Sequence, residues 1–308
     1  MKRLFFFFVL FSFLFSEDDF AKWVNLLKST DVTKRRMAAR RLGELKNRNA
    51  VPHLIKALND FDPGVRTAAA DSLGILRDKR AVNPLIQLLD DPVRSVKVSA
   101  LISLGFLRAR EATDKIIEVF NNEKDESVKV TASNVLGRIG DKRSVPHLAG
   151  ELLKNKSARI RASCASSLGM IRDKEAVKSL IKALKDEDIR VKEFTIIALG
   201  NIMDKKALKP LKKFFKEEKN LKLKILAANS IAKIGEKEGL LDFVLENAKN
   251  KDPYIRRIAC ETIGIIGKKN EKVVEIIKEL LEDKDRGVKY TAQRVAGMLK
   301  IKIEKEKK

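Results

Sequence analysis

Residues 50–80 read AVPHLIKALNDFDPGVRTAAADSLGILRDKR, and this stretch decides the fold. Its first part opens at Pro52 and spaces aliphatic residues along one face of a helix. Its second part opens with Asp62, a good helix N-cap, and Pro63, whose missing N–H costs nothing in the first helical turn. The charged residues at the end of the stretch form a link. We therefore predict a pair of short helices joined by a tight turn.

The dipeptide Leu73–Gly74 of this stretch recurs along the chain at intervals of 31 to 33 residues. It occurs at Leu42–Gly43, Leu73–Gly74, Leu104–Gly105, Leu136–Gly137, Leu168–Gly169 and Leu199–Gly200 and, with conservative changes, at Ile231–Ala232, Ile263–Gly264 and Ala296–Gly297. This period is too long for a coiled-coil heptad and fits one helix pair per repeat. Because one pair cannot bury its apolar face alone, the pairs must stack. The sequence therefore predicts an all-α fold, an α-solenoid of about nine helix pairs.

The second helix of most repeats begins with an Asp that precedes a basic residue by four positions. These pairs are Asp31/Arg35, Asp62/Arg66, Asp125/Lys129, Asp188/Lys192, Asp252/Arg256 and Asp285/Lys289. Helical spacing allows each Asp to cap its helix and also to pair with the basic residue four positions later, so we expect a structural ladder of ion pairs. Ser157 and Asn220 replace this Asp in two repeats, and Asp91–Pro92 is expected to start its helix slightly early, ahead of Val93.

These features resemble the HEAT-like repeats named after phycobilisome lyases. The resemblance rests on the turn Asp, the aliphatic and basic pair that follows it, the Ala and Leu–Gly positions, and a Pro- or Val-led apolar helix, and it extends over residues 19–303. It implies a right-handed superhelix of helix pairs. It implies little about activity, because the family includes scaffolds, lyase subunits and a few enzymes.

The first sixteen residues differ from the repeats. Met1, Lys2 and Arg3 form a basic start, residues 4–15 are an apolar run dominated by Phe, and Ser16 precedes acidic residues. Twelve residues form a helix of about 18 Å, which is too short for a bilayer and typical of a secretory signal. We predict a signal peptide at 1–16 and export to the periplasm or outside the cell; the alternative is a buried N-terminal helix. The solenoid is predicted at 17–303 and a charged tail at 304–308.

The cysteines and histidines give no indication of a metal or cofactor. Cys164 and Cys260 lie three repeats apart, which is about 30 Å at a helix-packing distance of about 10 Å per repeat, so a disulfide between them is excluded. The same distance separates His53 and His147, which therefore cannot share one metal ion. HEAT-like hydroxylases use His–Glu pairs, and this pattern is not met here. We predict no metal, no cofactor and no enzymatic activity.

Basic residues repeat in the links between helix pairs. The formal net charge is +23, although a lysine-rich background composition is one explanation for it. The predicted basic edge consists of Arg77, Lys79, Arg80, Arg108, Arg110, Lys142, Arg143, Arg172, Lys174, Lys205 and Lys206. This edge is either merely solvated or binds an anionic polymer, an acidic protein or lipid headgroups.

A second candidate surface lies on the second helices, on the side that lines the concave face of HEAT-like folds. The first, fifth and ninth positions after each repeated basic residue point away from the buried stripe. They are polar in the first repeat, where they are Arg36, Arg40 and Glu44. In later repeats apolar residues occupy such positions: Val98, Ile102, Phe106, Val130, Met170, Ile197 and Ile225. They predict a groove for a protein partner, unless tight curvature buries them.

Together these observations predict an exported, monomeric scaffold for protein–protein interaction, with the groove as its partner site. The first alternative is electrostatic binding of an anionic polymer or membrane surface through the basic edge. A lyase- or hydroxylase-related enzyme is the third possibility.

Overall fold

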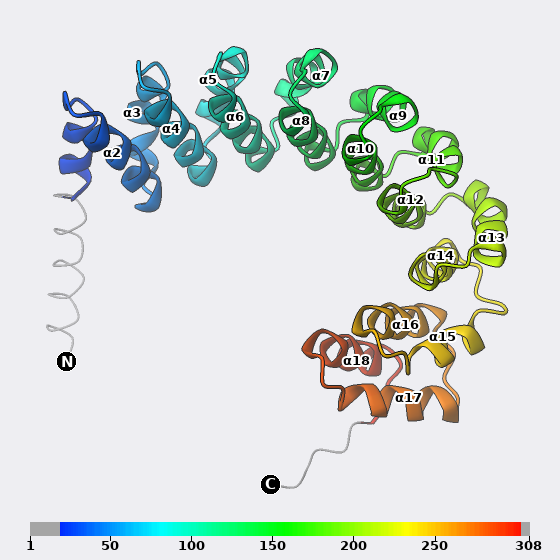
Figure 1. Cartoon of the computed structure of the whole chain (residues 1–308). Coiled ribbons are helices and arrows are strands. Elements are labelled where there is room, and N and C mark those ends of the chain that lie inside the picture. The colour runs from blue at the N-terminus through cyan, green and yellow to red at the C-terminus, as the bar shows by residue number, and fades with distance from the viewer. Residues whose placement is uncertain (1–18, 303–308) are drawn as a thin grey trace, which may run out of the picture. The chain divides into compact units, whose positions relative to one another are not determined.

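The computed structural model describes residues 19–302, and this part of the chain contains helices and no strands. The predicted all-α fold of stacked helix pairs is confirmed (Figure 1). The predicted signal peptide and the charged tail lie outside the described residues. The chain forms two compact units, which meet between His147 and Leu148 in the sequence. We call them the N-terminal unit and the C-terminal unit.

In the N-terminal unit, residues 19–26 are helical and take the first-helix position before α2, and three further helix pairs follow. The first helices of the pairs are α3 (Val51–Ala57), α5 (Val82–Gln87) and α7 (Thr113–Asn122). The second helices are α2 (Val32–Glu44), α4 (Pro63–Leu76), α6 (Arg94–Leu107) and α8 (Glu126–Ile139). Short 3₁₀ helices lie in the links and turns: η1 (Arg48–Ala50), η2 (Lys79–Ala81), η3 (Leu88–Asp90), η4 (Arg110–Ala112) and η5 (Lys142–Ser144).

The C-terminal unit continues the same alternation after α9 (Val145–Lys154), the helix in which the unit boundary falls. Its further first helices are α11 (Val177–Ala183), α13 (Leu208–Glu217), α15 (Leu241–Asn247) and α17 (Glu271–Leu281). Its second helices are α10 (Ala158–Ile171), α12 (Ile189–Ile202), α14 (Leu221–Ile234), α16 (Pro253–Ile266) and α18 (Arg286–Met298). η6 (Lys174–Ala176) precedes α11 and η7 (Lys205–Ala207) precedes α13. In each unit the first helices form one layer and the second helices another (Figure 1).

Most second helices start as the turn chemistry predicts. The Asp62 carboxylate accepts the N–H of Val65 at 3.0 Å, and Ser157 and Asn220 cap their helices in the same way. The expected early start at Asp91 is wrong, because α6 begins at Arg94 after the N-cap residue Val93. Asp91 instead lies in the turn, where its carboxylate accepts the Val93 N–H at 2.8 Å.

The expected ion pairs four residues apart are wrong at Arg35, Arg66 and Arg256. The capping carboxylates there are engaged with backbone N–H groups, and the arginine reaches the turn of the following repeat. Arg66 pairs with Asp91 at 2.7 Å rather than with Asp62. The same arrangement joins Arg35 to Asp60, Lys97 to Glu123, Arg161 to Asp186 and Arg256 to Asp283 at 2.6 to 2.8 Å.

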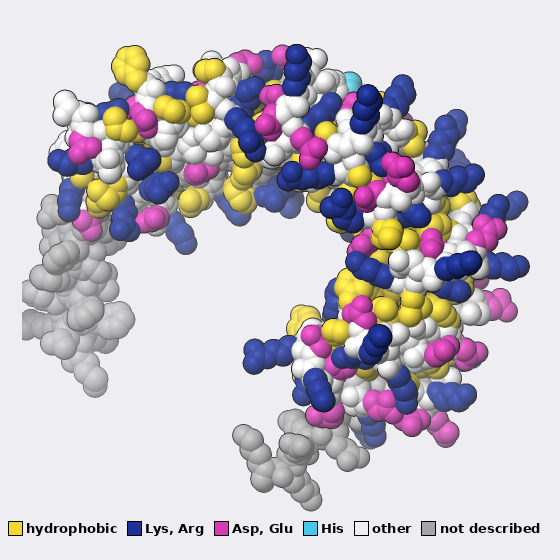
Figure 2. All heavy atoms as spheres, viewed as in Figure 1, with side chains coloured by type: hydrophobic (Ala, Val, Ile, Leu, Met, Phe, Trp, Pro, Cys, Tyr) yellow, Lys and Arg dark blue, Asp and Glu magenta, His cyan; other side chains and the backbone are white. Residues whose placement is uncertain are grey.

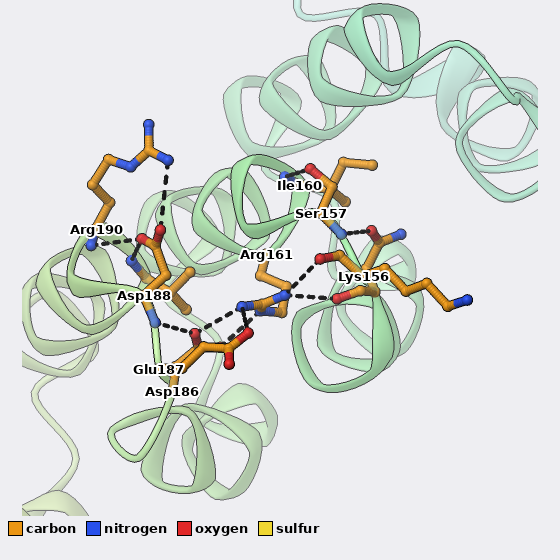
Figure 3. A network of polar contacts seen from close by, with 10 residues as sticks. Lys156, Ser157, Ile160, Arg161, Asp186, Glu187, Asp188 and Arg190 are labelled. Atoms are coloured by element: carbon orange, nitrogen blue, oxygen red, sulfur yellow. Dashed lines mark hydrogen bonds and ion pairs between the residues drawn. The ribbon is translucent and has the colours of Figure 1, made fainter.

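Figure 3 shows this arrangement around Arg161. Its Nη1 donates to the carbonyl oxygens of Asn155 and Lys156 in its own turn, at 2.9 and 3.1 Å. This leaves Nε and Nη2 for both carboxylate oxygens of Asp186, at 2.8 and 2.9 Å. Asp186 in turn accepts the N–H of Asp188, the N-cap residue of α12. One guanidinium therefore ties two successive turns together.

Several second helices pack closely because a glycine on one faces a serine on the next. A Cβ added at Gly74 would lie 2.9 Å from the Cβ of Ser103, and Gly43 faces Ser72 in the same way. The buried Ser103 hydroxyl donates to the Ala70 carbonyl at 2.8 Å, which satisfies it inside the interface. This close packing places equivalent positions of neighbouring second helices in rows across their exposed side.

Candidate functional site

Three apolar side chains are exposed on neighbouring second helices of the N-terminal unit. Ile102 and Phe106 of α6 are 37% and 41% exposed, and Ile75 of the adjoining helix α4 is 51% exposed. We call these three residues the Phe106 patch. The predicted Val98 and Val130 occupy the first position after their basic residues, in a different row from the three patch residues, and are half-buried. The sequence rule that selected Phe106 also selects Ile75, as the ninth position after Arg66, although the prediction did not include it.

Charged groups adjoin the Phe106 patch. The guanidinium carbon of Arg138, in the equivalent position on α8, lies 5.0 Å from the centre of the Phe106 ring, which is a cation–π geometry. Asp71 precedes Ile75 by one helical turn, and partial desolvation raises the pKa of its carboxyl. A hydrogen bond from Ser99 and the charge of Arg40 partly oppose this increase. The patch therefore combines apolar contact area with both signs of charge.

The predicted groove residues of the C-terminal unit are not exposed as a set. Met170 is 47% exposed and Ile197 is half-buried. Ile225 is 0% exposed, so its predicted outward position is wrong. Phe194, which the prediction omitted, is exposed one turn of α12 before Ile197.

The burial of Ile225 coincides with side chains that meet across α14. Lys222 on α14 pairs with Glu193 on α12 at 2.9 Å, and its ammonium lies 4.8 Å from the centre of the Tyr254 ring on α16. The Tyr254 hydroxyl donates to Glu193 at 3.4 Å. This cluster spans three helices one turn before Ile225. Burial and the Glu193 carboxylate raise the pKa of Tyr254 to about 12, so its hydroxyl stays protonated at neutral pH.

All eleven residues of the predicted basic edge are exposed, but carboxylates neutralise part of it. Arg80 pairs with Asp78 at 2.8 Å, and this contact lowers the pKa of Asp78 to about 2. Arg143 pairs with Asp141 at 2.7 Å and with Asp114 at 2.6 Å. The edge residues that form no ion pair with another described residue are Arg77, Lys79, Arg108, Arg110, Arg172, Lys174, Lys205 and Lys206.

Within residues 19–302 no three His, Cys, Asp or Glu side chains are grouped as metal ligands would be. His53 contacts the ring of Phe20, with 6.3 Å between ring centres, and His147 Nδ1 lies 3.1 Å from the amide nitrogen of Asn121. Cys164 and Cys260 are buried, and no disulfide joins them. Across the same residues, no helix combines the length and apolar character needed to span a bilayer.

Two open depressions of about 500 and 680 Å³ adjoin the start of α17. Both are lined by Asn270 and Glu271, together with lysines and a few aliphatic residues. The described side chains around them do not form a nucleophile–base pair or a metal-ligand set.

Helix pairs that stack through their second helices define an α-solenoid repeat protein. The family model for HEAT repeats matches residues 20–105, 82–155, 149–232 and 215–297. These matches extend over most of the chain, which therefore belongs to the HEAT repeat family, and the resemblance predicted from the sequence is confirmed.

Solved structures agree with this fold. The chain is 23% identical to a chain in the complex of CpcE and CpcF of phycocyanin lyase from Nostoc sp. PCC7120, with a TM-score of 0.52, over 71% of this chain and 93% of that chain. An engineered protein is 18% identical, with a TM-score of 0.53, over 92% of this chain and 99% of its own. No curated protein sequence matches the chain. At these identities the likenesses show the fold alone.

Proposed function

We propose that this HEAT repeat protein is a scaffold that binds a protein partner at the Phe106 patch. The observation that carries this proposal is the exposure of Phe106, Ile102 and Ile75 side by side on packed helices, with Arg138 against the Phe106 ring. Aromatic and Arg side chains are enriched among the residues that contribute most to protein interfaces. Burying one such apolar side chain fully contributes about 1.5–3 kcal/mol.

The partner's contact surface should be apolar and should cover three side chains from two neighbouring helices. The adjoining Asp71 and Arg138 set its orientation, because each offers a charge at the margin of the patch. A partner side chain that stacks on Phe106 would either displace Arg138 or pack against its guanidinium.

The test is capture of a partner from the source organism at high salt, with Phe106→Asp as the disruptive variant. Phe61→Asp is the matched control, because Phe61 is 101% exposed in the turn before α4, away from the patch. We expect one discrete protein to bind the unmodified chain and Phe61→Asp, and not Phe106→Asp, with all three equally folded by circular dichroism. Retention by Phe106→Asp would overturn the proposal.

The basic edge favours a second candidate, electrostatic binding of an anionic polymer or membrane surface. Its support is the set of eight exposed edge residues that form no ion pair with another described residue. Such binding would weaken steeply as salt is raised, and Phe106→Asp would leave it unchanged.

We propose binding rather than catalysis as the function. The likeness to a chain of the phycocyanin lyase complex would favour a lyase role instead. A chromophore absorbance band or a bound metal in the protein purified from its source would support that role and contradict ours.

We also propose that the chain is exported and that residues 1–16 are removed. The support is the basic start followed by the twelve-residue apolar run. N-terminal sequencing of the protein from its source should begin at Glu17. A chain that still begins at Met1 would contradict the proposal.

A further inference from the structure

Exposed lysines are concentrated on the outer side of α11 and α13 in the C-terminal unit. Lys209, Lys212, Lys213 and Lys216 follow helical spacing along one face of α13, and all four are exposed, whereas Leu211 on the opposite face is buried. η7, which leads into α13, contacts α11. We call the exposed lysines of residues 174–185 and 204–219 the lysine face. Figure 2 shows Lys and Arg side chains projecting outward from this region.

This concentration of charge is local and does not follow from a lysine-rich background. Residues 174–185 and 204–219 contain eleven lysines and four acidic residues. The equivalent stretches of the N-terminal unit, 79–90 and 109–124, contain five basic and five acidic residues. The same elements of the same fold are thus neutral in one unit and strongly basic in the other. A uniform composition bias would have raised the charge of both.

Carboxylates neutralise little of the lysine face. Lys212 pairs with Glu236 at 3.4 Å and Lys213 with Glu217 at 3.9 Å, and both lysines are largely exposed. The other lysines of the two stretches form no ion pair with another described residue. Two ion pairs among eleven lysines leave most of the positive charge of the lysine face without a paired carboxylate.

The side chains of the lysine face favour a lipid surface over a nucleic acid. The two stretches contain no Arg, and the Phe215 ring packs edge-on against Phe243 inside the unit, with 5.0 Å between centres. Base contacts come from Arg, Lys, Asn and Gln, and single strands are held by exposed aromatic rings, so the absence of Arg and the packing of Phe215 inside the unit weigh against a nucleic acid. Long, flexible lysines instead suit a plane of anionic headgroups, because each additional lysine near such a surface strengthens the binding.

We propose that the lysine face binds a membrane surface rich in anionic phospholipid. This inference deepens the second candidate function, because it names the part of the molecule that carries the charge and the partner that it meets. It is independent of the Phe106 patch.

The test is cosedimentation of the full chain with phosphatidylcholine vesicles, with and without phosphatidylglycerol, at low and high salt. Binding to phosphatidylcholine alone is subtracted, so the difference between the two vesicle types isolates the electrostatic part of the binding. The disruptive variant changes Lys209, Lys212, Lys213 and Lys216 to Gln, which has a similar helix propensity. The control variant changes Arg77, Lys79, Arg108 and Arg110 of the basic edge to Gln and removes the same number of charges.

We expect the unmodified chain and the control to bind anionic vesicles at low salt. The affinity of the α13 variant for these vesicles should be lower by about two orders of magnitude or more, at about fivefold per lysine. If the control variant lost binding and the α13 variant retained it, the basic edge and not the lysine face would be the binding surface. Equal losses in both variants would also overturn it. Failure of the unmodified chain to prefer anionic vesicles, or tighter binding to a duplex DNA probe, would overturn the membrane proposal altogether.

Discussion

Arg161 in α10 and Asp186 in the turn before α12 form a two-point ion pair, with Nε–Oδ2 at 2.8 Å and Nη2–Oδ1 at 2.9 Å. Both side chains are largely buried. Removing one partner leaves a buried charge without compensation, which typically costs about 3–5 kcal/mol. We therefore expect Arg161→Gln to destabilise the chain by about 3 kcal/mol, measured by urea unfolding and by faster amide exchange in α10 and α12.

Asp186→Asn should cost less than Arg161→Gln. An Asn side chain can still accept the Asp188 N–H, as Asn155 and Asn250 do for Ser157 and Asp252 in other turns. The double variant should lose less than the sum of the two single losses, because the pair acts as a unit. Additive losses would show that the two residues are not coupled.

Acid should destabilise the fold through the same kind of contact. Hydrogen bonds from Arg35 and Arg256 lower the pKa values of Asp60 and Asp283. A carboxyl with a lowered pKa binds protons less readily in the folded chain than in the unfolded one. Its contribution is complete above the ordinary value of 3.8 and is lost as the pH falls through the lowered value.

The urea midpoint should therefore stay level from about pH 7 to pH 5 and decrease below about pH 4. The arginine partners remain charged throughout. A variant with Asp60→Asn and Asp283→Asn should be less stable at neutral pH and should show a weaker decrease in acid. If the variant and the unmodified chain had the same acid dependence, these carboxyls would not be responsible.

The repeat period, the helix pairs and most N-caps could be predicted from the sequence, because they depend on neighbours within a few residues. The ion-pair partner of Arg66 could not be predicted from the sequence. Asp62 and Asp91 are both plausible partners, and the choice depends on how far apart successive turns lie and on which guanidinium nitrogens the turn carbonyls occupy. Helical spacing within one repeat determines neither the distance between successive turns nor the partners of the guanidinium nitrogens.

The candidate site also contains residues whose exposure the sequence predicts and one whose exposure it does not. Helical position correctly places Ile102 and Phe106 on the exposed side of α6, and the same rule includes the omitted Ile75. It fails at Ile225, because side chains of α12 and α16 meet across α14 one turn earlier. Exposure at such a position is set by three helices together.

Both thiols should be unreactive in the folded chain. Cys164 and Cys260 are fully buried, and burial raises the pKa of the Cys260 thiol to about 12. Since the thiolate is the reactive form, a thiol reagent at about pH 8 should label neither residue until urea unfolds the chain, and both should then react. Rapid labelling without urea would mean that the second helices open locally.

Two glycine substitutions should have opposite effects. Gly74→Ala places a Cβ 2.9 Å from the Ser103 Cβ and 3.0 Å from its Cα, so α4 and α6 must separate. Overpacking of this kind costs about 1–3 kcal/mol. Gly150, inside α9, has no atom within 4 Å of an added Cβ, so Gly150→Ala should stabilise the chain by about 0.5–1 kcal/mol through helix propensity alone. Urea unfolding of the two variants distinguishes the cost of overpacking at Gly74 from the gain in helix propensity at Gly150. Equal effects at both positions would mean that the Gly74–Ser103 contact does not limit how closely the second helices approach.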